Sequence, residues 1–397
     1  MAQLIIDQSK ITNKEEFIKL CPFGALTIEG GNVTVGAGCK MCKLCVKKGP
    51  AGAATVQEDE VKKIDKSLWR DITVYVDHDE GKIHPVTYEL IGKALELAGK
   101  IGQKVNCLFM GSDITKEASE LLHYGVDKVY IYDLPQLKHY ITESYTAVFE
   151  DHINMTKPCA ILVGATSVGR QLAPRVAARF NTGLTADCTV LDMDENTDLA
   201  QIRPAFGGNI MAHIETPNHR PQMATVRYKV MEAPKRNESE SGELISCTIA
   251  PEKLASRVEV LSVVPKPTQK SIENADCIVV AGRGVKTKED LELVKKLADA
   301  LGAELAATRP LIEAGWVEAR RQIGLSGRTV RPSLIVTCGV SGAVQFSAGM
   351  KNSDCIFAIN KDESAPIFSI ANYGLVGDLY KIIPKLIADI EEGKKNV

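Results

Sequence analysis

Apolar runs rich in β-branched residues alternate with helical patterns from Ile72 onward, and this order restricts the fold more than any other feature. The run ITVYVD at 72–77 indicates a strand. Apolar residues in 86–102 recur at i, i+3 and i+4, which indicates an amphipathic helix. A further strand-like run at 159–166 precedes a helical pattern at 168–180. Parallel strands joined by helices produce this order, so the sequence predicts a doubly wound α/β sheet.

Later segments predict a second α/β unit. Between about 184 and 230 strand-like runs follow one another without helices, which predicts an antiparallel extension of the sheet. The segment 258–275 then connects to a second unit that begins with the strand at 277–285 and contains a helix near 288–301. A last helix is expected from about Gly377. The predicted domains are 1–66, 67–262 and 263–397.

Length, charge and composition exclude several classes of function. The chain has 397 residues, more than one core usually accommodates, which suits two or three domains. A formal net charge of −2 gives no basic footprint for nucleic acid as the main partner. No apolar run approaches the roughly 20 residues of a membrane helix, and the first residues lack the pattern of a signal peptide. We therefore expect a cytoplasmic protein without membrane insertion, in which the presence of eleven cysteines points to metal or redox chemistry rather than to disulfides.

Four cysteines fall within the first 45 residues: Cys21, Cys39, Cys42 and Cys45. Two-cluster ferredoxins carry two runs of the form C-x₂-C-x₂-C-x₃-C-P, and the last cysteine of each run ligates the cluster of the other. In this chain the first run keeps only Cys21-Pro22. The second run keeps its first three cysteines but has Gly49-Pro50 in place of the fourth. One complete set of four ligands remains, which predicts one [4Fe–4S] cluster in a small ferredoxin-like α+β domain.

A zinc site made from the same four thiolates is the alternative. The C-x₂-C-x₂-C spacing suits an iron–sulfur cube better than paired zinc knuckles. The flanking segments PFGAL and GPAGAA are rich in small residues, which lets backbone N–H groups approach the sulfurs and tune the potential. The other seven cysteines are expected to be buried hydrophobic residues: Cys107, Cys159, Cys188, Cys247, Cys277, Cys338 and Cys355.

From Cys277 onward the chain resembles the alpha subunit of electron transfer flavoproteins. The resemblance rests on six ordered blocks: Gly282-Arg283-Gly284, Thr308-Arg309-Pro310, GWVEARRQIGLSGR, CGVSGAVQFSAGM, AINKDESAPIF and YGLVGDL. Upstream, VGATSVGRQLAPRVAARFNTGLTADC is similar to the N-terminal domain of the same family. The resemblance covers about 68–397 and implies two doubly wound α/β domains, of which the C-terminal one binds FAD.

Small residues after the strands, as in 339–343, let backbone N–H groups face a pyrophosphate. The resemblance implies FAD contacts at the following residues: Arg283, Thr308, Arg309, Ile323, Gly324, Leu325, Ser326, Ser341, Gly342, Ala343, Val344, Gln345, Phe346, Asn360, Asp378 and Leu379. Among them, Asp378 is expected to accept a hydrogen bond from the ribose or the adenine of the nucleotide.

Two of these residues are the predicted catalytic ones, Arg309 and Ser326. A guanidinium over the isoalloxazine ring stabilises added negative charge, which is the role implied for Arg309. Ser326 is implied to hydrogen-bond the flavin N5. The family commonly has histidine after the glutamine of its S-G-A-x-Q block, whereas this chain has Phe346, which can only pack. The potentials of the flavin therefore do not transfer from the family.

A ferredoxin-like extension on such an alpha subunit resembles the electron-bifurcating group of anaerobes, as in caffeyl-CoA reductase and lactate dehydrogenase complexes. The resemblance implies a subunit of an NADH-dependent acyl-CoA (enoyl-CoA) reductase complex that also reduces ferredoxin. The implied partners are a beta subunit whose flavin is reduced by NADH, ferredoxin, and an acyl-CoA dehydrogenase-type subunit. A lactate (2-hydroxy-acid) dehydrogenase partner is the runner-up.

Other functions stay open at this stage. A free-standing flavin and iron–sulfur oxidoreductase, or a redox sensor, would oxidise NADH or respond to redox state as an isolated chain. A housekeeping electron transfer flavoprotein would serve several dehydrogenases without needing the cluster.

One further motif, Gly164 to Arg170, follows a predicted strand and opens a helix. Binding of a phosphate there, a place beside the beta subunit's nucleotide pocket, and a purely structural turn are all open. Arg170 and Arg175 are the residues expected to reach a beta subunit from this motif.

Overall fold

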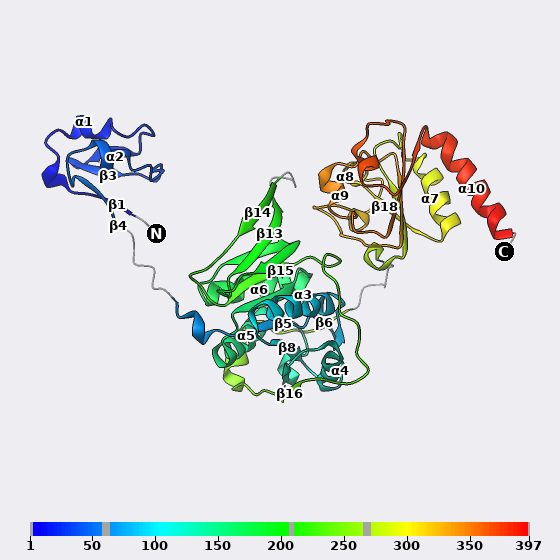
Figure 1. Cartoon of the computed structure of the whole chain (residues 1–397), viewed down its shortest axis with the longest axis horizontal. Coiled ribbons are helices and arrows are strands. Elements are labelled where there is room, and N and C mark those ends of the chain that lie inside the picture. Colours follow the sequence, from blue (N-terminus) through cyan, green and yellow to red (C-terminus); the bar gives the residue numbers. More distant parts are fainter. Residues whose placement is uncertain (1–2, 58–63, 206–209, 265–270, 396–397) are drawn as a thin grey trace. The chain divides into compact units, whose positions relative to one another are not determined.

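The computed structural model describes residues 3–57, 64–205, 210–264 and 271–395 (Figure 1). The chain divides into two compact units, Met1–Lys63 and Ile64–Val397. Of the predicted linker QEDEVKKIDK, residues 58–63 lie outside the described residues. The predicted domain boundaries at 66/67 and 262/263 stay predictions.

The first unit is a small α+β fold. Two strands pair antiparallel near its ends, and two others form a hairpin whose turn residues Gly30 and Gly31 both have positive φ, as a tight two-residue hairpin turn requires. The elements are β1 (Gln3–Ile6), α1 (Lys14–Ile18), β2 (Leu26–Glu29), β3 (Asn32–Val35), α2 (Leu44–Lys48) and β4 (Ala54–Gln57). The core is small: Ile11, Phe17, Leu26, Val33, Cys45, Ala53 and Ala54. A core of this size usually needs help from a metal or a disulfide.

The second unit contains a seven-stranded sheet in the order β11-β15-β10-β5-β8-β9-β16, with every pairing parallel. The strands are β5 (Ile72–Tyr75), β8 (Val105–Gly111), β9 (Lys128–Asp133), β10 (Ala160–Gly164), β11 (Leu184–Cys188), β15 (Gln222–Val226) and β16 (Glu243–Ser246). A short hairpin, β6 (His78–Asp79) and β7 (Lys82–Ile83), follows the first of these strands. The predicted doubly wound α/β fold is confirmed.

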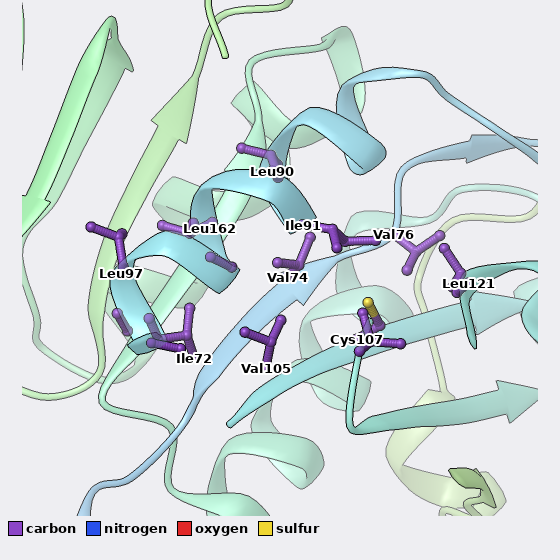
Figure 2. Close-up of a cluster of buried hydrophobic side chains, with 14 of the residues drawn as sticks. Ile72, Val74, Val76, Leu90, Ile91, Leu97, Val105, Cys107, Leu121 and Leu162 are labelled. Carbon is purple, nitrogen blue, oxygen red and sulfur yellow. The ribbon is translucent and has the colours of Figure 1, made fainter. Parts of the chain in front are cut away.

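Helices cover both faces of this sheet because alternate strand residues point to opposite sides. One face packs against α3 (Val86–Ile101) and α4 (Thr115–Glu120), and Figure 2 shows Leu90, Ile91 and Leu97 of α3 over the strands. The other face packs against α5 (Thr142–Thr156) and α6 (Ser167–Arg179). Along β5, Ile72 and Val74 face the first cluster and Tyr75 the second. Strands buried on both faces are typical of parallel sheets.

The predicted antiparallel extension is only partly right. The strands β12 (Val190–Met193), β13 (Leu199–Ala205) and β14 (Ile210–Ile214) are antiparallel, but they form a separate three-stranded sheet. By contrast, β11 and β15 belong to the parallel sheet, where β15 is buried along its whole length. The difference lies in burial, because β15 inserts between two strands whereas β14 keeps an exposed face.

A second parallel sheet of five strands, in the order β18-β17-β19-β20-β21, follows in the same unit. Its strands are β17 (Cys277–Ala281), β18 (Glu304–Ala307), β19 (Leu334–Cys338), β20 (Cys355–Asn360) and β21 (Tyr373–Val376). Figure 1 shows α7 (Leu291–Leu301) and α10 (Leu379–Lys395) side by side, and both pack on one face of this sheet. The other face is covered by loops and short helices that include α9 (Val344–Ser347), while α8 (Arg309–Glu313) follows β18.

Two edge strands, β16 and β21, are not expected from the sequence. Their residues are mostly exposed and lack the alternation that identifies a half-buried strand. Among the described helices, none is both long enough and apolar enough to cross a membrane.

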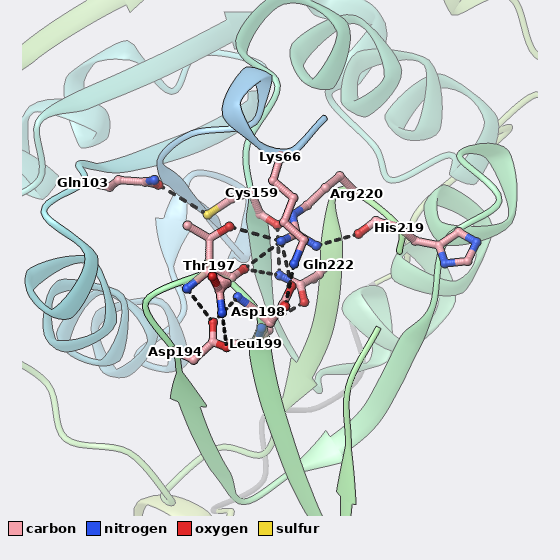
Figure 3. Close-up of polar contacts among 11 residues, drawn as sticks. Lys66, Gln103, Cys159, Asp194, Thr197, Asp198, Leu199, His219, Arg220 and Gln222 are labelled. Atoms are coloured by element: carbon pink, nitrogen blue, oxygen red, sulfur yellow. Dashed lines mark hydrogen bonds and ion pairs between the residues drawn. The ribbon is translucent and has the colours of Figure 1, made fainter. Parts of the chain in front are cut away.

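A polar network ties the small antiparallel sheet to the seven-stranded sheet (Figure 3). The fully buried guanidinium of Arg220 donates to the backbone oxygen of Thr197 at 3.0 Å and to Asp198 Oδ1 at 2.9 Å. The ammonium of Lys66 donates to the other oxygen of Asp198 at 2.6 Å. Gln222 completes the network, because its side chain donates to the Thr197 oxygen and accepts from the N–H of Leu199.

Removing the shared carboxylate of Asp198 is expected to cost much more stability than removing its partly exposed partner Lys66. Asp198→Ala leaves the buried guanidinium of Arg220 without its counter-charge, so the free energy of unfolding should fall by about 3–5 kcal/mol. Lys66→Met should cost less than ~1 kcal/mol, because the Lys66 side chain remains a third exposed. Urea unfolding of the two variants measures both values. If both variants lose the same small amount of unfolding free energy, the ion pair between Asp198 and Arg220 does not contribute the expected stability.

The buried imidazole of His152 makes stability fall in acid. His152 lies inside α5 with Nε2 3.2 Å from the Thr73 hydroxyl, and burial lowers its pKa from 6.5 to about 3. The unfolded chain therefore takes up a proton that the folded protein excludes. The stability from this group is complete above pH ~6.5 and is lost toward pH ~3, at about 1.4 kcal/mol per pH unit. We expect His152→Leu to flatten this acid limb in urea unfolding measured from pH ~7 to ~4, and an unchanged slope would contradict the assignment.

Candidate functional site

One pocket in the first unit is lined by all four predicted ligand cysteines. Cys21 follows α1, Cys39 and Cys42 lie in the loop before α2, and Cys45 lies in the first turn of that helix. Their exposure is graded, since Cys42 is exposed, Cys21 and Cys39 are intermediate, and Cys45 is buried. The fold thus brings a residue at position 21 to the same pocket as the 39–45 run.

The loop that carries three of these cysteines has an unusual backbone. Met41 and Lys43, the residues beside Cys42, both have left-handed φ values of 51° and 61°. Such values are strained for residues other than glycine and concentrate at functional sites. In loops that include left-handed residues, successive backbone N–H groups point into a shared concave surface. In many proteins such a surface binds phosphates or iron–sulfur groups.

The structure also explains why a fourth cysteine is missing from the second run. A Cβ atom added at Gly49 would lie 2.4 Å from the carbonyl oxygen of Cys45 and 2.8 Å from the ring of Phe17. No side chain fits there without a shift of backbone. The position that ligates the second cluster in two-cluster ferredoxins is therefore closed in this chain.

Backbone N–H groups surround the sulfur of Cys21, as the small residues of PFGAL predict. The N–H of Ala25 donates to Cys21 Sγ at 3.4 Å. Burial raises the pKa of the Cys21 thiol, but the N–H groups of residues 23–26 outweigh burial and the net pKa shift is downward. At Cys45 burial dominates and raises the pKa, and the nearby Cys39 and Cys42 add to that rise.

The donor set, the left-handed loop and the N–H donors fit an iron–sulfur cluster. Among the described residues, no group of three or more His, Cys, Asp or Glu side chains converges closely enough to hold a single metal ion. The four thiols instead line the wall of a shared pocket. The [4Fe–4S] site remains a prediction, as does its zinc alternative.

The predicted FAD contacts gather at one edge of the five-stranded sheet. Arg283 follows β17, Thr308 follows β18, Ser341 follows β19, Asn360 ends β20 and Asp378 follows β21. After β17 the chain adds β18 on one side and β19 on the other, which makes the gap beyond their carboxyl ends the switch point of the sheet. Ligands of open α/β sheets bind in such a crevice.

Glycines allow the loops at this switch point to touch. A Cβ atom on Gly282 would lie 2.4 Å from the Gly339 oxygen, so the loops after β17 and β19 approach too closely for a side chain. Gly342 has a φ of 81°, and its Cβ would lie 2.2 Å from the backbone nitrogen of Ile367. The bare backbone of this loop fits the pyrophosphate of a dinucleotide.

The predicted loop 323–326 packs against the loop after β19. The N–H of Leu325 donates to the Gln345 oxygen at 2.8 Å, which joins two predicted contact segments that are separate in sequence. The exposed hydroxyl of Ser326 accepts from Gln322 Nε2 at 2.8 Å. Sequence reasoning does not single out Gln322, because a lone glutamine next to a glycine-containing loop carries no pattern.

Several predicted side chains have structural partners of their own. Asn360 Nδ2 donates to the Val340 oxygen at 2.7 Å and so holds the loop after β19. Asp378 Oδ1 accepts from the N–H of Tyr380 at the start of α10. Phe346, which replaces the family's histidine, is buried in the core beneath the loop and packs as expected.

Arg309 is exposed, and its Nε donates to Glu313 Oε1 at 2.7 Å one helical turn away. An exposed pair of this kind contributes little to stability.

Arg309→Ala should therefore leave the melting temperature within about 2 °C of the wild type. If the guanidinium contacts the flavin, the same variant should lower the FAD content after dialysis and shift the visible flavin spectrum. Lys295→Ala, which removes another exposed helical ion pair, is the matched control. An unaltered spectrum and flavin content would refute the role of Arg309.

The turn at Gly164 to Arg170 favours the structural interpretation. The Thr166 hydroxyl accepts from the N–H of Gly169 at 3.1 Å and donates to the buried carboxylate of Asp77. A carboxylate beside the turn disfavours a phosphate there. Arg170 pairs with Asp187 at 3.1 Å and Arg175 approaches Glu143 at 3.9 Å, so each has an acidic neighbour within its own region.

Two family descriptions match the second unit. The electron transfer flavoprotein domain matches residues 72–252, which contain the seven-stranded sheet. The electron transfer flavoprotein FAD-binding domain matches 271–351, which contains the loops after β17, β18 and β19.

Curated relatives extend over most of the chain. The lactate dehydrogenase (NAD(+),ferredoxin) subunit LctC of Acetobacterium woodii is 58% identical over 96% of this chain and 91% of its own length. The electron transfer flavoprotein subunit alpha of Thermoanaerobacterium thermosaccharolyticum is 44% identical over 82% of this chain and 99% of its own. The acryloyl-CoA reductase electron transfer subunit beta of Anaerotignum propionicum is 40% identical over 83% and 98%.

Proposed function

Because the chain belongs to the electron transfer flavoprotein alpha-subunit family, we propose that it is the alpha subunit of an electron-bifurcating complex. In this role it transfers electrons between a beta-subunit flavin reduced by NADH, ferredoxin and a dehydrogenase subunit. FAD in the C-terminal domain supplies the ability to exchange electrons singly or in pairs. The loops after β17 and β19 would hold its pyrophosphate, and Arg309 and Ser326 would face its ring.

The observation that carries the proposal is the share of this chain that the match to LctC covers. That match covers 96% of this chain, whereas the match to the alpha subunit of Thermoanaerobacterium covers 82%. The difference is close to the share of the first unit, which holds 63 of 397 residues. The name of LctC includes ferredoxin, and the first unit here carries the four-cysteine pocket. We infer that this unit binds a [4Fe–4S] cluster that takes part in exchange with ferredoxin.

The same comparison ranks the dehydrogenase partners. LctC is named as a lactate dehydrogenase subunit and is 58% identical, while the acryloyl-CoA reductase relative is 40% identical. We therefore place a lactate (2-hydroxy-acid) dehydrogenase partner first and an acyl-CoA dehydrogenase-type partner second, which reverses the order expected from the sequence. The substrate binds on that other chain.

Anaerobic purification of the tagged chain with the proteins that accompany it tests the proposal. We expect about four irons, about four sulfides and one FAD for this chain, together with a beta subunit and a dehydrogenase identified by mass spectrometry. Lactate should drive NAD⁺ reduction only when reduced ferredoxin is present, and an enoyl-CoA assay tests the second partner. Zinc without sulfide would contradict the cluster, and NADH oxidation by the isolated chain would favour a free-standing oxidoreductase.

A further inference from the structure

Basic residues concentrate around the cysteine pocket of the first unit. Lys40 and Lys43 line the pocket between the cysteines, and Lys47 and Lys48 follow one helical turn later on α2. All four ammonium-bearing side chains are exposed. The N–H of Lys47 donates to the Lys43 oxygen, which places these two lysines on the same side of the helix. We call Lys40, Lys43, Lys47 and Lys48 the lysine surface.

The stretch of sequence that carries the lysine surface is rich in lysine and contains no acidic residue. Residues 30–57 contain no Asp or Glu, and the four carboxylates of the described first unit are Asp7, Glu15, Glu16 and Glu29. One of them, Asp7, already pairs with Lys10. Seven lysines against four carboxylates give the described unit a net charge of +3 in a chain whose formal net charge is −2. The described part of this unit therefore carries net positive charge, and four of its seven lysines lie between residues 40 and 48.

An aromatic ring and one of the four cysteines are exposed in the pocket that the lysine surface adjoins. Phe23 lines the pocket next to Cys21, and 54% of its surface is accessible to solvent. Cys42 is the exposed member of the four cysteines. Phe23 thus lines the same pocket as Lys40 and Lys43, and an exposed aromatic ring beside charged side chains is typical of interfaces, which combine apolar contacts with a charged rim.

We propose that the lysine surface, together with Phe23, is the docking surface for an acidic electron-carrier protein. Lysine charges would attract the carrier over long range and orient it, and Phe23 would exclude water where the two redox centres meet. The proposal rests on the proposed cluster, because docking beside Cys42 is useful only if a redox group lies in the pocket. One electron passes from the cluster to the oxidised carrier, so the cluster is oxidised and the carrier reduced.

A second role for the same lysines must be separated from docking. Positive charge beside a cluster with four thiolate ligands also stabilises its reduced form and raises its potential. Tuning of this kind changes the potential but not the affinity for a carrier. Docking changes the affinity and its salt dependence while the potential stays in place.

The test compares two triple variants in the complete complex with its accompanying subunits. Lys40, Lys47 and Lys48 are changed to Gln in the first, which leaves the left-handed residue Lys43 intact. Lys10, Lys14 and Lys19, which belong to the same unit but do not line the pocket, are changed to Gln in the control. A purified acidic bacterial ferredoxin is the probe, and calorimetry gives its dissociation constant at several salt concentrations. Three further quantities are measured alongside: ferredoxin reduction with NADH in the presence of pyruvate or an enoyl-CoA, which accepts the other electron on the dehydrogenase subunit; iron and sulfide content; and the cluster potential by redox titration.

The docking variant should bind ferredoxin about tenfold more weakly at low salt and show a shallower salt dependence, whereas the control variant matches the wild type. Iron, sulfide, subunit content, the KM for NADH and the cluster potential should stay at wild-type values. Equal affinities in both variants would overturn the docking surface, as would a shift in potential without a change in affinity. Loss of the beta or dehydrogenase subunit from the docking variant alone would make the surface an assembly interface, which also overturns it.

Failure of the proposed function has a different signature. If the wild-type complex lacks iron and sulfide, the cluster and the bifurcating role fail. The ferredoxin affinities of the wild type and the two variants still decide whether the lysine surface binds an acidic carrier. If the wild type does not bind ferredoxin at any salt concentration, the docking surface fails whatever the metal content.

Discussion

Cys42→Ser is expected to remove the proposed iron–sulfur cluster while leaving the flavin in place. Cys42 is exposed, so the replacement of sulfur by oxygen disturbs no packing, and any loss of iron reports a lost ligand. Iron and sulfide should fall from about four per chain to near zero, and NADH-dependent ferredoxin reduction should be lost with them. FAD content should not change, because FAD belongs to the second unit.

Loss of the cluster should also loosen the first unit. Its core consists of seven buried residues, three of them alanine or cysteine, which is little for an independent fold. Cys42→Ser should therefore make this unit more sensitive to limited proteolysis. The matched control is Cys355→Ser, which changes a half-buried cysteine on β20 and should leave iron, sulfide and the proteolysis pattern as in the wild type. Full iron content in Cys42→Ser would contradict the assignment of the four ligands.

Gly342→Ala is expected to abolish FAD binding. The added Cβ would lie 2.2 Å from the backbone nitrogen of Ile367 and 2.4 Å from its Cα, and neither atom can move as a side chain would. The φ of 81° adds strain for any residue other than glycine. Together these effects should lower the free energy of unfolding by several kcal/mol, and FAD content after gel filtration should fall at least tenfold.

Two companion variants separate the site from the fold. Gly393→Ala lies on α10, where an added Cβ meets no atom within 4 Å, and should be neutral or slightly stabilising. Ser341→Ala removes only an exposed hydroxyl in the same loop, so weaker FAD binding there reports a lost contact. Thermal unfolding and flavin absorbance measure all three variants. A Gly342→Ala protein with full FAD content would show that the loop after β19 is not part of the site.

The sequence predicts the candidate FAD site as a set of separate blocks, and the structure explains why these blocks belong together. Thr308, Ser341 and Asp378 are far apart in the chain but follow three strands of one parallel sheet. The pattern of strands and helices predicts such an edge, because the carboxyl ends of parallel strands lie on the same side. The partners of individual side chains do not follow from that pattern. Glu313 beside Arg309 and Gln322 beside Ser326 appear only with the coordinates.

Two misassigned or missed regions have a common physical cause. The runs between 184 and 230 read alike in hydrophobicity, yet β15 inserts into the parallel sheet and β14 does not. Periodicity reports which residues prefer burial, but the strand that each run pairs with depends on segments distant in sequence. The edge strands β16 and β21 are missed for the opposite reason, since exposed residues carry no burial pattern.

The sequence alone was enough to identify three features: the alternation of strands and helices, the four cysteines, and the flavoprotein blocks. Local preferences and ligand spacing are properties of short segments, so they can be identified without a fold. Tertiary structure alone decided the left-handed loop beside Cys42, the contact of the loops after β17 and β19, and the place of Phe23 in the pocket that Lys40 and Lys43 line. Each of these depends on backbone geometry or on the approach of distant segments, which chain order by itself does not encode.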